Sequence, residues 1–227
     1  MCFSAEASFG ASAVIGIIGI IALKKATNFP QKVFAIIPIF FAVQQFLEGM
    51  LWLVLDGKLY MSWKQPLILG FLFFAWLVWP VYIPFSMAMF EKNRIKRKVL
   101  LSFLGLGFLI ILGFLYVMIF HNIDANAAKL HINYTYDYVP PLPWIYGLLY
   151  LIPTIVSFML SSVKKMWALG LINLTSYIFS RIFFFGHVLS VWCFFGAVAS
   201  VFILWYIIQL NKIEVHQEDE YGVNQTA

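Results

Sequence analysis

Charged residues are scarce in this chain of 227 residues. Asp, Glu, Lys and Arg make up 11% of it, whereas 63% of its residues are apolar and its mean hydropathy is +0.88. A soluble domain needs many more polar side chains to cover its surface, so this composition excludes a soluble globular protein. A bilayer core about 30 Å thick is crossed by a helix of roughly 20 apolar residues. The sequence therefore predicts an all-α, polytopic membrane protein.

Cysteine is nearly absent as well, because Cys2 and Cys193 are the only two in the chain. There is no Cys-x-x-Cys, His-x-x-x-His or His-Glu-x-x-His motif, so spacing alone defines no metal site. Internal repeats, linkers and low-complexity segments are also lacking. The net charge of +5 requires no polyanionic partner, and we expect no binding to nucleic acid.

Seven apolar runs predict a single seven-helix transmembrane domain at 1–210, followed by a short polar cytoplasmic tail at 211–227. The spans are expected at about 7–23, 33–55, 66–90, 99–120, 142–162, 167–185 and 189–210. The longest connection, 121–141, is expected to be a loop on the outside. Prolines within the second, third and fifth spans predict kinks or locally open turns there. They are Pro38, Pro80, Pro84 and Pro153.

Most basic residues fall in alternate gaps between the runs. Of the 15 Lys and Arg residues, these gaps and the end of the last run hold Lys24, Lys25, Lys32, Lys92, Arg94, Lys96, Arg97, Lys98, Lys164, Lys165 and Lys212. Lys- and Arg-rich loops stay in the cytoplasm, which places the N-terminus outside and the C-terminus inside. The basic loop at 91–98 is interpreted as a topology signal that attracts anionic headgroups, so membrane lipids are the expected partners.

Two ionisable side chains, Glu48 and Arg181, lie inside the predicted spans. Each costs about 2.5–3.5 kcal/mol on insertion scales, which makes it a candidate functional residue. Glu48 lies about 10 Å, and Arg181 roughly 6 Å, from the outer end of its helix at 1.5 Å per residue. The two can therefore pair at similar depth. One interpretation is a purely structural ion pair that determines how the second and sixth helices dock.

A second interpretation is a functional pocket, because further polar residues gather at the same level. Candidate substrate contacts are Gln44, Gln45, Asn173 and Ser180. Candidate catalytic residues are Glu48, Arg181 and His187. Glu48 is the candidate general base, His187 an acid or base, and Arg181 an electrostatic clamp on an anionic group. Ser176 and Tyr177 extend the polar stripe that leads to Arg181.

A metal centre is a further hypothesis for the same level. Thiolate, imidazole and carboxylate groups bind transition metals such as zinc. The candidate ligands are Cys2, Glu48, His187 and Cys193. An oxidising compartment instead favours a disulfide between Cys2 and Cys193, and two separate buried thiols are a third interpretation. These alternatives stay open, and no cofactor is assigned.

Three segments carry a resemblance to a known family. The opening MCFSAEASFGA, the segment FAVQQFLEGMLW and the segment SVWCFFGA resemble an uncharacterised family of bacterial integral membrane proteins that begin Met-Cys-Phe-Ser-Ala. The resemblance spans most of the chain. It implies seven helices and a bacterial inner membrane, and it implies no activity.

Three functions are compatible with these observations. The first is a membrane-embedded, metal-dependent enzyme that acts on a lipid or another amphipathic substrate. The second is a proton-linked transporter or small-ligand-binding protein in which Glu48 changes its protonation state. The third is a sensor or assembly subunit with a cofactor enclosed by the polar residues and the eight Trp side chains.

Overall fold

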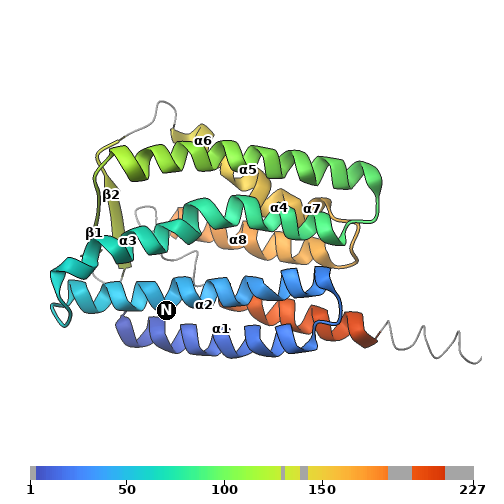
Figure 1. The fold of residues 1–227 in the computed structure, drawn as a ribbon, viewed down its shortest axis with the longest axis horizontal. Coiled ribbons are helices and arrows are strands. Elements are labelled where there is room, and N and C mark those ends of the chain that lie inside the picture. Colours follow the sequence, from blue (N-terminus) through green and yellow to red (C-terminus); the bar gives the residue numbers. More distant parts are fainter. Residues whose placement is uncertain (1–3, 129–130, 139–142, 184–195, 213–227) are drawn as a thin grey trace, which may run out of the picture.

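The computed structural model describes residues 4–128, 131–138, 143–183 and 196–212. Within these residues the chain forms seven helical rods that lie side by side (Figure 1). The first two rods are α1 (Ala5–Lys25) and α2 (Phe29–Leu55). The third rod is a continuous run of four elements: η1 (Met61–Trp63), α3 (Lys64–Leu72), η2 (Phe73–Val78) and α4 (Trp79–Phe90). The fourth rod is α5 (Arg94–Phe120). The other three are α6 (Pro143–Leu151) with η3 (Ile152–Val156) and α7 (Ser157–Leu160), α8 (Met166–Phe183), and the helix Gly196–Lys212.

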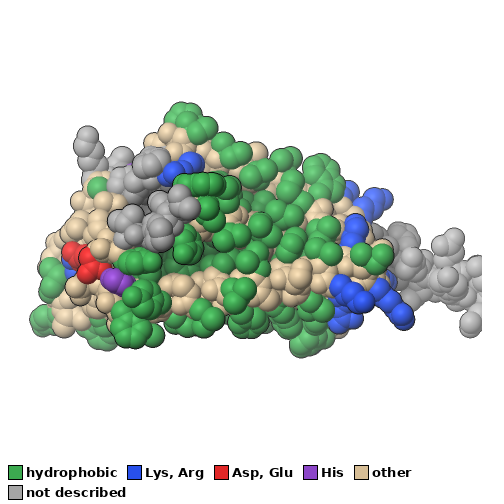
Figure 2. Space-filling model, turned by 90° about the horizontal axis from the view of Figure 1, so that it is seen from above, with side chains coloured by type: hydrophobic (Ala, Val, Ile, Leu, Met, Phe, Trp, Pro, Cys, Tyr) green, Lys and Arg blue, Asp and Glu red, His purple; other side chains and the backbone are tan. Residues whose placement is uncertain are grey.

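Four of these rods are long and apolar enough to cross a membrane. They are α1, α2, the run Met61–Phe90, and α5. Their outward faces are also apolar, as Ile17 on α1 and Leu109 on α5 illustrate with exposed fractions of 58% and 66%. Figure 2 shows hydrophobic side chains along the length of the molecule. A surface of this kind suits lipid rather than water, so the chain is a mostly helical membrane protein.

Polar side chains mark where the first helices begin. Ser4 Oγ accepts a hydrogen bond from Ala7 N at 3.2 Å, at the start of α1. Asn28 Oδ1 accepts one from Gln31 N at 3.0 Å, at the start of α2. The first backbone N–H groups of a helix lack partners within the helix, and these caps satisfy one of them in each case. Residues 26–28 connect α1 to α2, and the two helices lie antiparallel (Figure 1).

Basic side chains gather at one end of the molecule, which we call the basic end (Figure 2). The turns between α1 and α2, between α4 and α5, and between α7 and α8 all lie there, as does the end of the helix Gly196–Lys212 (Figure 1). The alternate gaps of the sequence are therefore neighbours in space.

The apolar core is divided into two clusters. One lies toward the basic end and includes Phe34, Met87, Leu100, Leu169 and Ile203. The other lies toward the opposite end and includes Leu51, Ile68, Phe71, Leu72 and Ile132. Helix α2 contributes to both clusters. Gln44 and Gln45 lie between the parts of α2 that enter the two clusters, and Glu48 lies at the edge of the second cluster, beside Leu47.

Two rods contain a locally widened helical turn, as the prolines predict. The π-helical turn η2 comes directly before α4, whose second residue is Pro80, and the π-helical turn η3 contains Pro153. Proline lacks an N–H group and its ring crowds the carbonyl of the preceding turn, which favours such a widened turn. Around Pro38, by contrast, α2 stays α-helical without a widened turn, and a kink there stays a prediction.

The prediction of a loop at 121–141 is wrong in part, because this segment contains a β-hairpin. Strands β1 (Ile123–Ala128) and β2 (His131–Tyr136) pair antiparallel, with Ile123 opposite Tyr136. Alternate residues face the core, and the Tyr134 ring stacks on Phe71 with centroids 4.9 Å apart. This period-two pattern is typical of a half-buried strand.

An ion pair attaches the hairpin to the start of α3. Lys64 Nζ lies 2.6 Å from Asp124 Oδ1. The hydrogen bond from the Lys64 side chain lowers the pKa of Asp124 despite partial burial, and the backbone N–H of Ala125 adds to this effect. The hairpin thus covers the opposite end of the molecule from the basic end (Figure 1).

A candidate functional site in the polar layer

Helix α2 carries a group of polar side chains that are buried almost completely. The exposed fractions are 0% for Gln44, 2% for Gln45 and 0% for Glu48. Gln45 Nε2 donates a hydrogen bond to Glu48 Oε2 at 2.9 Å. Trp79 Nε1 donates to Gln44 Oε1 at 2.9 Å and links α4 to α2. We call Gln44, Gln45, Glu48 and Trp79 the polar layer, which lies where the two apolar clusters meet along α2.

Two further donors extend the polar layer, and sequence reasoning missed both. Trp52 follows Glu48 by four residues and therefore lies on the same face of α2. Ser8 lies in α1. The next residue, Phe9, packs its ring against Gly49, which follows Glu48 in α2, so Ser8 lies at the level of Glu48. Within the described part of the chain, Ser8 Oγ and Trp52 Nε1 are buried without a hydrogen-bond partner. Such atoms are costly to bury, so they mark a place suited to a polar ligand atom.

The widened turn η2 lies next to the polar layer. Trp79 is the first residue after η2, so its indole is held at the point where the helix returns to α-helical geometry. Tyr150 of α6 donates its hydroxyl hydrogen to the carbonyl oxygen of Ala75, within η2. A side chain from a neighbouring rod therefore satisfies a carbonyl in the widened turn, as an apolar environment requires.

The candidate residues of α8 have different surroundings. Asn173 Nδ2 donates to Leu169 O at 2.9 Å, so this contact stays within its own helix. Ser180 is fully buried, and its Oγ lacks a hydrogen-bond partner among the described residues. Arg181 lies in the last turn of α8 and is exposed. The pairing of Glu48 with Arg181 stays a prediction.

The packing of α8 gives no reason to place its polar face against the polar layer. Its main contacts among the described elements are with α7 and η3. Gly170 allows this approach, because a Cβ atom there would lie 2.6 Å from Met159 Cγ. The described contacts therefore unite Gln44, Gln45 and Glu48, whereas they leave Asn173 and Ser180 on a separate helix.

The predicted metal centre depends mainly on residues outside the described ranges. Cys2, His187 and Cys193 all lie outside them, and the predicted disulfide lies there too. In the described ranges, no group of three or more His, Cys, Asp or Glu side chains is arranged to hold a metal ion. The metal hypothesis therefore stays a prediction.

The chemistry of the polar layer follows from its groups. A carboxyl group such as that of Glu48 can bind or release a proton, and Gln45 donates a hydrogen bond to one of its oxygens. Ser8 and Trp52 can each donate a hydrogen bond to an acceptor atom of a ligand. The arrangement suits the binding of a small polar group and the exchange of one proton.

The chain belongs to a family of unknown function, DUF6629, whose pattern matches residues 1–217. This match confirms the resemblance to an uncharacterised family that the three sequence segments carry. The chain matches no curated protein and no solved structure. Its activity must therefore be inferred from its own residues.

Proposed function

We propose that this chain is a seven-span membrane carrier that binds a small polar or amphipathic ligand at the polar layer and exchanges a proton at Glu48. The proposal includes an N-terminus outside, a C-terminus in the cytoplasm and a location in a bacterial inner membrane. The observation that carries it is the full burial of Glu48 where the two apolar clusters meet, beside two donors that lack partners within the described residues.

The charge distribution supports the orientation. The basic end collects the turns that hold most Lys and Arg residues (Figure 2). Cytoplasmic loops carry an excess of these residues, so the basic end is assigned to the cytoplasm. The end with the hairpin is then outside. Because seven is an odd number of membrane crossings, the two termini lie on opposite sides of the membrane.

Burial of Glu48 supports a functional role for this residue. A carboxyl group inside a membrane protein is costly, and such residues usually belong to proton relays or substrate pathways. A structural role requires only enough partners to satisfy the group. Ser8 and Trp52 go beyond this requirement, because they add donors that remain unpaired in the described part of the chain.

The widened turns favour a carrier over an enzyme. Carrier binding sites often lie deep in the membrane, beside helices that are interrupted locally. Here η2 leads directly into Trp79, which contacts Gln44. Three of the four predicted metal ligands lie outside the described residues, so the metal-dependent enzyme stays a prediction.

Uptake into proteoliposomes tests this function. The purified protein is reconstituted and offered organic acids, organic amines and short-chain amphiphiles, with and without an inward proton gradient. We expect one class to accumulate only when the gradient is present. Glu48→Gln should abolish gradient-driven uptake, because an amide cannot exchange a proton. Glu6→Gln, which changes an exposed carboxylate in the first turn of α1, should leave uptake unchanged.

Two serine variants locate the ligand. Ser8→Ala should raise the half-saturating solute concentration about tenfold, the cost of one lost hydrogen bond in a buried site. Ser86→Ala is the matched control, because Ser86 is as buried as Ser8 and its Oγ also lacks a partner in the described ranges, but it belongs to α4. The proposal is wrong if no class is taken up, or if Glu48→Gln transports as well as the original protein.

A further inference from the structure

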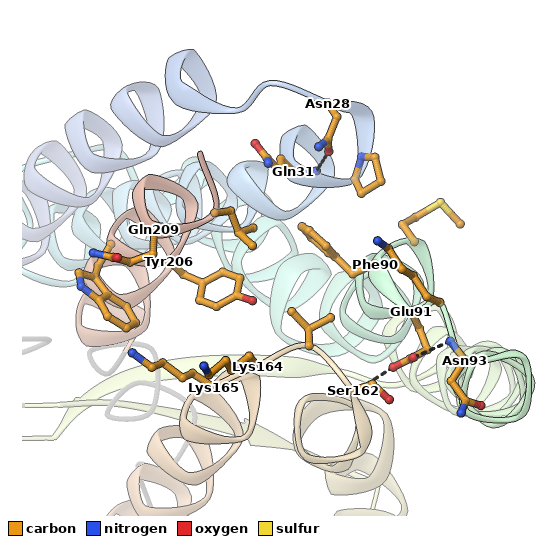
Figure 3. A pocket seen from close by; sticks show the side chains of 16 residues that line it. Asn28, Gln31, Phe90, Glu91, Asn93, Ser162, Lys164, Lys165, Tyr206 and Gln209 are labelled. Carbon is orange, nitrogen blue, oxygen red and sulfur yellow. Dashed lines mark hydrogen bonds between the residues drawn. The ribbon is translucent and has the colours of Figure 1, made fainter. Parts of the chain in front are cut away.

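A cavity lies at the basic end, away from the polar layer. Its volume is about 880 Å³, within the range typical of small-molecule sites. Four segments form its walls: the start of α2, the turn between α4 and α5, the turn between α7 and α8, and the end of the helix Gly196–Lys212 (Figure 3). We call it the basic-end pocket. None of its lining residues belongs to the polar layer.

Three lysines line this pocket: Lys92, Lys164 and Lys165. Among the described residues, none of the three forms an ion pair. The ammonium group of Lys165 lies 4.9 Å from the centre of the Trp205 ring, which holds it against the wall. The pocket is thus rich in positive charge that the described protein residues do not neutralise.

Glu91 is the acidic residue of the lining, but its oxygens are already engaged. Its Oε1 accepts from Asn93 N at 2.9 Å and its Oε2 accepts from Ser162 N at 2.7 Å (Figure 3). Burial raises the pKa of Glu91, but the hydrogen bonds from these backbone groups outweigh burial and lower it overall. Glu91 is therefore ionised. Three lysines and one carboxylate leave the lining with a net formal charge of +2.

The N-terminal ends of three helices border the pocket. Helix α2 begins beside Asn28, α5 beside Asn93, and α8 just after Lys165. The N-terminus of a helix carries a partial positive charge, which favours an anion nearby. The helix ends and the lysines therefore act in the same direction.

Neutral hydrogen-bond donors complete the polar part of the lining. The Tyr206 hydroxyl is directed into the pocket, and Gln209 lies one turn away on the same helix (Figure 3). In the described ranges, neither side chain forms a hydrogen bond with the protein. Apolar walls from Phe90, Val163 and Leu210 lie beside these donors. The pocket thus combines an anion-binding rim with surfaces that suit a hydrocarbon chain or another apolar moiety.

We infer that the basic-end pocket is a binding site for a phosphate-bearing anion, held by Lys92, Lys164 and Lys165 and by the hydroxyl of Tyr206. Phosphate is the anion whose charge and several acceptor oxygens match lysines that surround it together with neutral donors. The same chemistry is present in the headgroup of an anionic phospholipid and in a soluble phosphate ester. This inference does not depend on a transport role for Glu48.

Titration of the intact protein in phosphatidylcholine nanodiscs tests the inference. The probes are short-chain phosphatidylglycerol, short-chain phosphatidylcholine of equal chain length, and glycerol 3-phosphate, with binding followed by native mass spectrometry. We expect phosphatidylglycerol to bind more tightly than phosphatidylcholine. Binding of glycerol 3-phosphate with equal affinity would assign the site to a soluble ester, and weaker binding of it would assign the site to a lipid headgroup.

Two double variants separate a built site from general surface attraction. Lys164→Gln with Lys165→Gln should weaken phosphatidylglycerol binding about 30-fold, from about fivefold per lysine near a membrane surface. Lys24→Gln with Lys25→Gln removes the same charge at the same end, outside the pocket, and should weaken binding less than about threefold. Equal losses in the two double variants would overturn the inference.

A third variant keeps the test decisive if the first double variant does not fold. Tyr206→Phe retains the ring and removes only the hydroxyl group. It should weaken phosphatidylglycerol binding about tenfold, as expected for a hydrogen bond to a charged group. Unchanged affinity in Tyr206→Phe, or equal affinity of the original protein for phosphatidylglycerol and phosphatidylcholine, would also overturn the inference.

Discussion

Substitution of Gly107 by Ala tests the closest approach between two rods. Gly107 lies in α5, opposite the backbone of Pro80 in α4. A Cβ atom at Gly107 would lie 2.8 Å from the carbonyl carbon of Pro80, with the carbonyl oxygen of Pro80 closer still. Ordinary van der Waals contact begins at 3.4 Å, so the rods would have to separate by at least about 0.6 Å.

The cost should lie at the upper end of the range for an overpacked core. Such substitutions usually cost about 1–3 kcal/mol, and side chains often absorb part of the strain by rotating. Here the obstructing atoms belong to the backbone, which cannot rotate away. We therefore expect Gly107→Ala to cost about 3 kcal/mol. For a chain of this length, this corresponds to a fall in melting temperature of roughly 6–12 °C.

Thermal unfolding in detergent, followed by circular dichroism, measures the effect. Gly105→Ala and Gly113→Ala are matched controls, because a Cβ atom at either position of α5 meets nothing within 4 Å. Both controls should be neutral or stabilise the helix by up to about 1 kcal/mol. If Gly107→Ala melts at the same temperature as these controls, the contact between α4 and α5 is wrong.

Two further predictions concern the ion pair and the buried carboxylate outside the spans. Lys64→Gln should reduce the hydrogen-exchange protection of β1 and β2 by about 1 kcal/mol or less, because the pair with Asp124 is partly exposed. The folded protein lowers the pKa of Asp124. The loss of protection in Lys64→Gln should therefore be fully present above about pH 4, and it should disappear as the pH falls below the lowered pKa of Asp124 in the folded protein. Glu91→Gln should lower the stability to unfolding in sodium dodecyl sulphate by about 1–2 kcal/mol, because its single remaining carbonyl oxygen replaces two that accept from Asn93 and Ser162. Unchanged stability of Glu91→Gln, or a Lys64→Gln effect that persists in acid, would contradict these assignments.

Much of the fold could be predicted because hydrophobic length and charge are read locally along the chain. The rod α2, for example, extends the predicted span at 33–55 only by its capped first turn. The hairpin was missed because its apolar alternation is short and its burial depends on packing, such as that of Tyr134 on Phe71. Local periodicity carries no information about a partner that lies over 60 residues away.

The candidate site could be predicted only in part. Burial of Glu48 follows from its position in an apolar run, and Gln44 and Gln45 follow from helical spacing. Trp52 was not singled out, because a tryptophan in a span is usually an apolar packing residue, and only the structure shows its buried N–H. The basic-end pocket also escaped prediction, because its lysines were interpreted as a topology signal and their convergence requires the three-dimensional packing.

The orientation of the rods decides which side of the membrane the basic-end pocket faces, and cysteine labelling in intact bacterial cells tests this orientation most directly. In a background with Cys2→Ser and Cys193→Ser, single cysteines are introduced as Asp56→Cys, at the end of α2, or Lys98→Cys, in the second turn of α5. Both positions are exposed. We predict that a membrane-impermeant maleimide labels Asp56→Cys in intact cells and labels Lys98→Cys only after permeabilisation. The reverse pattern, or equal labelling of both in intact cells, would contradict the account.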